Sequence, residues 1–133
     1  ELAIQDLDIA ITLSPDYGRA YKNRGVAYIE LGQYDQAIED LTMAIRLNPS
    51  YFLPYKNRDV AYFHMGNLKS AMNDINEAIR LNPRYDWAYA DRALVNTFLG
   101  NDVAARLDID RAVELGFNRD LLDAGIEMAK TQR

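Results

Sequence analysis

The chain has 133 residues, of which 49% are hydrophobic and 26% charged, and its 15 Lys and Arg against 20 Asp and Glu give a net charge of −5. The absence of cysteine excludes disulfides, thiolate nucleophiles and Cys-ligated zinc, and a single histidine excludes the paired histidines of most zinc hydrolases. The composition indicates a folded protein, and the acidic balance disfavours binding to a nucleic-acid backbone.

Neither the hydrophobic runs nor the N-terminus carries a membrane or targeting signal. No stretch reaches the roughly 20 apolar residues that a membrane-spanning helix needs, so we expect no membrane span. The N-terminus lacks an initiating methionine and a basic-then-apolar signal pattern, so any targeting segment was removed or never present. The sequence does not indicate a compartment, and a cytoplasmic location is the default expectation.

The sequence repeats itself with a period of 34 residues. The prolines and glycines that mark this period are Pro15, Pro49, Pro83, Gly32, Gly66 and Gly100. The second half of each period also recurs, with helical i, i+4, i+7 spacing, at Ala37, Leu41, Ala44, Ala71, Ile75, Ala78, Ala105, Ile109 and Ala112. A unit of this length predicts stacked helical hairpins, because one hairpin cannot bury its apolar face alone.

In chain order, the first expected helix covers residues 2–13 and corresponds to the second half of a repeat. Its partner helix is missing from the sequence, so an apolar flank formed by Leu2, Ile9 and Ile11 should stay uncovered. A segment of a longer array would have such a flank. Self-association through this end is the alternative.

The next two helices form the first complete hairpin. Residues 18–31 predict a helix with Tyr21, Gly25 and Tyr28 on its buried stripe, which ends where Gly32 can adopt the left-handed conformation. Residues 34–47 predict its partner helix, which ends because the following Asn-Pro pair cannot continue a helix.

The same pattern recurs in residues 52–85 and 86–119. A last helix is expected over residues 119–130, with Leu122, Ile126 and Ala129 on one face. Polar residues occupy most of the remaining surface of this helix, as in the capping helix that seals the end of a repeat array from water.

These features resemble the tetratricopeptide repeat family. The resemblance rests on an aromatic residue early in the first helix, a small residue four positions later, the glycine turn and the closing proline. The residues that carry it include Tyr21, Tyr55, Tyr89, Gly25, Ala93, Pro49 and Pro83. It implies an all-α, right-handed superhelical solenoid of antiparallel hairpins. A single domain over 1–133 would comprise half a repeat (1–17), three repeats (18–51, 52–85 and 86–119) and a capping helix (120–133).

Two further patterns concern the packing of the hairpins. Each of Arg24, Arg58 and Arg92 has an aspartate sixteen residues later, which predicts an ion pair linking the two helices of every hairpin. Asp59 occupies the position of the small residues Gly25 and Ala93, so we expect a buried carboxylate that costs stability unless it is paired.

A second stripe on the first helix of each hairpin should line the hollow of the superhelix, and we call it the groove stripe. Its candidate binding residues are Arg19, Lys22, Asn23, Val26, Lys56, Asn57, Val60, His64, Trp87, Asp91 and Phe98. Resemblance to the family implies that this surface binds a peptide or an extended protein segment.

The groove stripe offers suitable chemistry for such a ligand. Asn23 and Asn57 each carry a donor and an acceptor and can pair with a peptide backbone of any sequence. Lys22 and Lys56 can attract an acidic side chain or a C-terminal carboxylate. Aromatic residues of the third repeat offer apolar anchors, and ordinary solvated helix surface is the other explanation of the Lys and Asn pairs.

One branch of the family, the chaperone adaptors, holds a ligand carboxylate with a clamp of lysines and asparagines. Lys22 and Asn57 match that pattern. Val26 stands at the position of a clamp asparagine, and Trp87 and Asp91 stand where basic residues of the third repeat would be. Because the clamp is incomplete, the tail of a heat-shock chaperone is not the expected ligand.

The sequence therefore predicts a non-enzymatic protein-interaction module that binds an extended segment in the groove, with no cofactor and no metal. A structural role, through self-association of the N-terminal helix, is the alternative. No nucleophile elbow, phosphate loop or metal motif supports an enzyme, and the net charge disfavours a nucleic-acid ligand.

Overall fold

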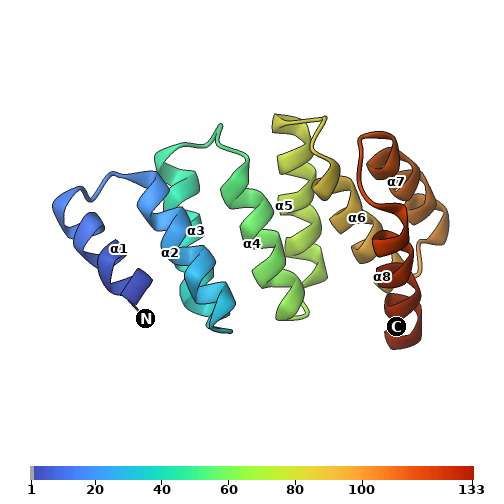
Figure 1. Ribbon diagram of the computed structural model, residues 1–133, viewed down its shortest axis with the longest axis horizontal. Helices are drawn as coiled ribbons and strands as arrows, with labels where there is room; N and C mark the ends of the chain where they lie inside the picture. The colour runs from blue at the N-terminus through green and yellow to red at the C-terminus, as the bar shows by residue number, and fades with distance from the viewer. Residues whose placement is uncertain (1) are drawn as a thin grey trace. The chain divides into compact units, whose positions relative to one another are not determined.

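A computed structural model describes residues 2–133, with side chains from Ala3 onward, and these residues form eight helices and no strand (Figure 1). The helices are α1 (Leu2–Leu13), α2 (Gly18–Glu30), α3 (Tyr34–Leu47), α4 (Leu53–His64), α5 (Leu68–Leu81), α6 (Asp86–Phe98), α7 (Asp102–Glu114) and α8 (Arg119–Gln132). The all-α fold class is confirmed. The expected helix over 18–31 ends one residue earlier, and the last helix extends two residues further than expected.

The chain consists of two compact units, Glu1–Asp74 and Ile75–Arg133, and the boundary between them along the sequence falls within α5. In the first unit, α3 packs against both α2 and α4, and α1 packs against α2 (Figure 1). In the second unit, α6 packs against both α7 and α8. The central helix is therefore α3 in the first unit and α6 in the second.

Glycine ends the first helix of the hairpins, as the sequence predicts. Gly32 follows α2 with a φ of +74°, and the equivalent Gly100 follows α6 with a φ of +81°. Residues with a Cβ rarely adopt this conformation, so glycine allows the chain to reverse at once into the next helix. The backbone N–H of Gln33 then donates to the carbonyl of Tyr28, which closes the end of α2.

The core of the first unit lies where α2, α3 and α4 meet. Ala37, Leu41 and Ala61 are fully buried there. Gly25 of α2 comes so close to α3 that a Cβ on it would lie 2.8 Å from the Cγ of Leu41. Asp59 of α4 is only 2% exposed, so its predicted burial is confirmed.

The core of the second unit is sealed by α8. Phe117, Leu122 and Ile126 form one buried cluster with Tyr89 and Ala93 of α6. The expected capping face of α8 is therefore confirmed, because Leu122, Ile126 and Ala129 are all buried.

The first helix leaves apolar side chains exposed. Ile9 is 60% exposed, as expected, and Leu13 is 78% exposed. Ile11 is half-buried, contrary to expectation, because it shares the stripe of Ile4 and Leu7, which are also half-buried. The side chain of Leu2 lies outside the described residues. Among the described residues, no helix is both long enough and apolar enough to cross a membrane.

Candidate functional site

The first helix of each hairpin is held in place by its arginine. Arg58 donates from Nε to Oδ2 of Asp74 and from Nη2 to Oδ1, both over 2.8 Å, which joins α4 to α5. Arg24 forms the same bidentate pair with Asp40 over 2.7 Å. The predicted ion pairs are confirmed, and their parallel hydrogen bonds fix helix orientation more tightly than a single contact would.

The hydrogen bond to Asp40 raises the pKa of Arg24 above its usual value, against the opposing effect of burial. Burial raises the pKa of Asp74 above its usual value even though its partner, Arg58, acts in the opposite direction. Both members of the Arg58–Asp74 pair are largely withdrawn from water. These pairs therefore belong to the framework of the hairpins.

Each arginine also makes a third contact that the sequence analysis missed. Nη1 of Arg58 donates to Oγ1 of Thr42 over 2.9 Å, and Nη1 of Arg24 donates to Oδ1 of Asp8 over 2.8 Å. Nη1 of Arg92 donates to Oδ1 of Asn76 over 3.0 Å. The three acceptors are spaced 34 residues apart, so the signal was present in the sequence, but their side chains are of three different kinds. Each arginine thus joins its own helix to the second helices on both sides.

The groove stripe of the first unit lies on α2 and α4, which contact each other directly. Arg19 and Asn23 are exposed on α2, where Lys22 is half-buried. Lys56 and Asn57 of α4 are half-buried, as are Val26 and Val60. The two Lys-Asn pairs therefore occupy the same repeat position on neighbouring helices of one unit.

Two members of the predicted stripe in this unit have particular surroundings. Arg19 borders a cavity of about 430 Å³, lined also by Asp16, Tyr17, Gly18, Leu47, Asn48 and Tyr51. His64 is the last residue of α4, and its ring stacks on that of Tyr34, the first residue of α3, with centroids 5.1 Å apart. His64 is therefore an exposed residue at the C-terminal end of α4 whose ring stacks on the start of α3.

The stripe of the second unit has a different character. Trp87 and Asp91 border a cavity of about 300 Å³ between α6 and α8, lined also by Ala90, Leu94, Phe117, Leu121, Leu122 and Gly125. The rings of Trp87 and Phe117 meet edge to face, with centroids 4.7 Å apart. Phe98 lies at the other end of α6 and is not among the lining residues.

Three residues that were not predicted from the sequence also line this cavity, two of them on α8 and one in the link before it. Phe117, Leu121 and Gly125 were not among the candidates, although Leu121 directly precedes a residue of the expected capping face. The only signal in the sequence was an additional apolar residue, Leu121, next to the expected buried residue Leu122. Only the packing of α8 on α6 reveals that both leucines line the same cavity.

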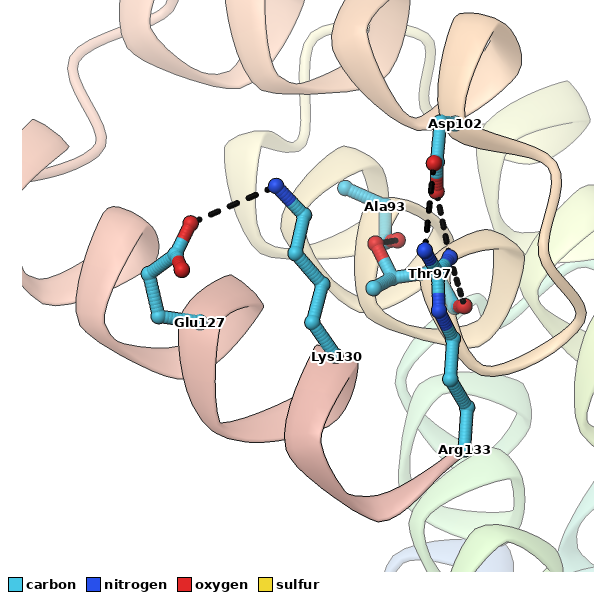
Figure 2. A network of polar contacts seen from close by, with 6 residues as sticks. All are labelled: Ala93, Thr97, Asp102, Glu127, Lys130 and Arg133. Atoms are coloured by element: carbon cyan, nitrogen blue, oxygen red, sulfur yellow. Dashed lines mark hydrogen bonds and ion pairs between the residues drawn. The ribbon is translucent and has the colours of Figure 1, made fainter.

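A polar network ties the end of α8 to the turn between α6 and α7. Figure 2 shows Arg133 reaching the carboxylate of Asp102, and its Nη1 also donates to the backbone carbonyl of Thr97 over 3.1 Å. The Thr97 hydroxyl donates in turn to the carbonyl of Ala93 over 2.8 Å. These contacts hold the C-terminal end of α8 against the end of α6 and the start of α7. Within the described residues, no three His, Asp or Glu side chains gather closely enough to hold a metal ion.

Two family models match the chain, and both are described as tetratricopeptide repeat. They cover residues 18–51 and 60–85. The first of these ranges coincides with the first complete repeat expected from the 34-residue period. No sequence match was found among the curated proteins.

Solved structures with the same fold include the first tetratricopeptide domain of Spaghetti (RPAP3), bound to the HSP90 peptide SRMEEVD. That domain is 28% identical to this chain with a TM-score of 0.79, and the match covers 86% of this chain and 91% of that one. The second such domain of Spaghetti, bound to the same peptide, is 29% identical with a TM-score of 0.72, over 86% and 99% of the two chains.

A structure of MamA matches over 97% of this chain and 75% of its own, with a TM-score of 0.85 and 21% identity, and at that identity the likeness concerns the fold alone. The repeat models match in successive periods, the described helices pair into hairpins, and the similar structures include tetratricopeptide domains. The chain is a tetratricopeptide repeat protein.

Proposed function

We propose that this chain is a non-enzymatic protein-interaction module that binds an extended segment of another protein along the groove stripe of α2 and α4. The observation that carries the proposal is the repetition of a Lys-Asn pair, Lys22-Asn23 and Lys56-Asn57, on two helices that contact each other. An asparagine side chain can donate to and accept from one peptide unit of a ligand backbone. Two such residues on neighbouring helices would hold an extended chain without reading its sequence.

The charges of this stripe favour an acidic ligand. Arg19, Lys22 and Lys56 give it a basic character, although the whole chain is acidic. Hydrogen bonds between ammonium or guanidinium groups and a carboxylate are about twice as strong as neutral ones. An acidic side chain or a C-terminal carboxylate is therefore the group that we expect these residues to bind.

The two Spaghetti domains support a peptide ligand, since both are bound to the acidic HSP90 peptide. The residues that differ in this chain argue for another acidic segment. Val26 offers no hydrogen bond where the clamp of chaperone adaptors has an asparagine, and Asp91 carries the wrong charge for a basic position of that clamp. We expect SRMEEVD to bind much more weakly than a peptide selected for this chain.

The test is calorimetry with a peptide selected from a random display library on the folded chain. Replacing both asparagines, Asn23→Ala with Asn57→Ala, removes two hydrogen-bonding side chains. At about 0.5–1.5 kcal/mol for each bond, the affinity should fall roughly 5- to 150-fold. Asn73→Ala is the control, because Asn73 is an exposed asparagine on the second helix of a hairpin. Equal affinities in the double variant and the parent chain would contradict this site.

Self-association is the second candidate function, and the exposure of Ile9 and Leu13 on α1 favours it. Exposed apolar side chains on one helix are candidates for burial against another protein surface. Sedimentation velocity over a hundredfold range of concentration tests this function. A second species that disappears in the variant Ile9→Gln with Leu13→Gln would support it, and a monomer at every concentration would exclude it.

A further inference from the structure

The cavity between α6 and α8 lies wholly within the second unit and differs in chemistry from the groove stripe of the first unit. Its volume is about 300 Å³. For comparison, an apolar cavity of roughly 150 Å³ in another protein binds benzene. The cavity therefore has room for a large side chain of a ligand.

The repeat register accounts for the different chemistry. Ala90 of α6 occupies the position that is lysine in the two preceding repeats, and Leu94 occupies a position that is valine in both. Trp87 stands where the first repeat has Arg19. The third repeat has thus replaced cationic side chains with hydrocarbon, while keeping the helical framework.

The packing of α8 completes the cavity. Leu122 and Phe117 are buried in the core of the unit, whereas Leu121 is 59% exposed at the edge of the cavity. Gly125 faces Leu94, and a Cβ at this residue would lie 3.3 Å from Cδ2 of that leucine. A larger residue would press against Leu94, so the glycine allows α8 to lie close to α6 at this edge of the cavity.

The charge of the lining restricts the occupant. Asp91 is its one charged residue, so an acidic side chain is repelled. Asp91 also takes part in an interaction within the chain. The surface that the cavity offers is the hydrocarbon of Trp87, Leu94 and Leu121, with no lysine or arginine among the lining residues.

The geometry points to a binding site for one large apolar side chain, of the size of leucine, methionine or phenylalanine, carried by an extended protein segment. This inference rests on the proposed function and adds an apolar anchor to it. Anchors of this kind, seated in a preformed pocket beside an aromatic residue, contribute most of the affinity in many protein interfaces. Desolvation of the anchor against Trp87 would supply the driving force.

The test uses N-acetyl amino-acid amides as probes and Trp87 as the reporter. Trp87 is the sole tryptophan of the chain, so its fluorescence reports directly on the cavity. We expect N-acetyl-L-leucinamide and N-acetyl-L-phenylalaninamide to produce saturable fluorescence changes at millimolar concentration. The amide NMR signals of Ala90, Leu94 and Gly125 should shift with the same affinity. N-acetyl-L-lysinamide should produce neither effect.

A pair of variants on α8 makes the test specific. Leu121→Glu places a carboxylate at the edge of the cavity, and because Leu121 is exposed the fold should persist, which circular dichroism checks. It should weaken binding of the apolar amides at least tenfold. Met128→Glu is the matched control, because Met128 is 62% exposed on the same helix and does not line the cavity. It should leave their binding unchanged.

Two results would overturn the inference: no saturable change with any apolar amide, or equal binding in the Leu121→Glu and Met128→Glu variants. The double variant Asn23→Ala with Asn57→Ala should bind the apolar amides like the parent chain. If the selected peptide loses affinity in that double variant while the amides fail to bind, the proposed function stands and the anchor site is wrong. The reverse pattern would support the anchor site and contradict the proposed function.

Discussion

Arg58 and Asp74 form a two-point ion pair in which both hydrogen bonds are 2.8 Å long and both side chains are mostly shielded from water. The guanidinium also lies over the rings of Tyr55 and Tyr62, with its carbon 5.9 and 5.7 Å from the two centroids. The charge of Arg58 is therefore stabilised mainly by Asp74, because little water is available to solvate the guanidinium if the carboxylate is removed.

The first prediction follows from this dependence. Asp74→Ala should lower the free energy of unfolding by about 2–4 kcal/mol, since it leaves the charge of Arg58 without its main acceptor in a largely dry site. Arg58→Lys should also destabilise the chain, because an ammonium group cannot make the parallel pair of bonds. Urea titration followed by circular dichroism measures both effects.

The exposed pair of Lys130 and Glu127 on α8 provides the control. Lys130→Ala should change the free energy of unfolding by no more than about 0.5 kcal/mol, as for other exposed pairs on a helix. If Asp74→Ala lowered the free energy of unfolding as little as Lys130→Ala, the buried pair of Arg58 and Asp74 would not stabilise the fold.

The second prediction concerns the contact of α2 with α3. Replacing a helical glycine by alanine usually stabilises a helix by about 1 kcal/mol. Gly25→Ala should instead destabilise the chain by roughly 1 kcal/mol, because its Cβ would lie 2.8 Å from Cγ of the fully buried Leu41 and overpacking costs more than the helix gains. Thermal unfolding measures the difference.

Gly18→Ala is the matched substitution on the same helix. A Cβ there would lie 3.6 Å from Cβ of Leu47, an ordinary contact, so this variant should be as stable as the parent chain or slightly more stable. A higher melting temperature for Gly25→Ala than for Gly18→Ala would show that α2 and α3 are not so closely packed.

The third prediction compares two tyrosines at the same repeat position. The hydroxyl of Tyr89 donates to the carbonyl of Pro83 over 2.8 Å, whereas that of Tyr55 is 3.4 Å from the carbonyl of Pro49. Tyr89→Phe should therefore cost about 1 kcal/mol in the free energy of unfolding, and Tyr55→Phe markedly less. Denaturant titration of the two single variants would contradict the assignment if the order were reversed.

The fourth prediction concerns pH and the end of α8. The hydrogen bond from Arg133 holds the pKa of Asp102 below its ordinary value. A carboxylate whose pKa is lower in the folded state contributes stability above its unfolded pKa, near 4, and loses that contribution as the pH falls through the folded value. Arg133→Ala should raise the pKa of Asp102 and lower the melting temperature at pH 7, with a smaller difference from the parent chain at pH 2, where only the hydrogen bond to the Thr97 carbonyl is lost.

Carbon-detected NMR titration of the Asp102 carboxyl group measures this shift directly. Arg119→Ala is the control, because Arg119 pairs with Asp110 instead. That variant should leave the titration of Asp102 unchanged. An unaltered pKa in Arg133→Ala would mean that this contact at the end of α8 does not form in solution.

Much of the fold could be predicted from local signals. The spacing of residues such as Leu41 and Ala44 determines helices with one buried face, and a glycine such as Gly32 determines where the first helix of a hairpin stops. The Arg58–Asp74 pair was also predictable. An arginine and an aspartate sixteen residues apart recur in every repeat, which indicates that the two charges lie next to each other on the two helices of a hairpin.

The site was less predictable, since it depends on which side chains meet across helices. His64 falls on the groove stripe by helical periodicity, yet its ring stacks on Tyr34. The third acceptor of each arginine was harder to recognise, because Asp8, Thr42 and Asn76 recur at the 34-residue period but share only a side-chain oxygen.

The sequence by itself determined the helices, their order and the pairs that repeat, because these follow from periodicity within one stretch of chain. Only the tertiary structure decided that Trp87 and Leu121 border one cavity. They lie on α6 and α8, and no local rule specifies the distance between two helices that are not consecutive. That distance depends on the volumes of the side chains packed between the helices, and Gly125, which has no side chain, allows α8 to approach Leu94 of α6 closely.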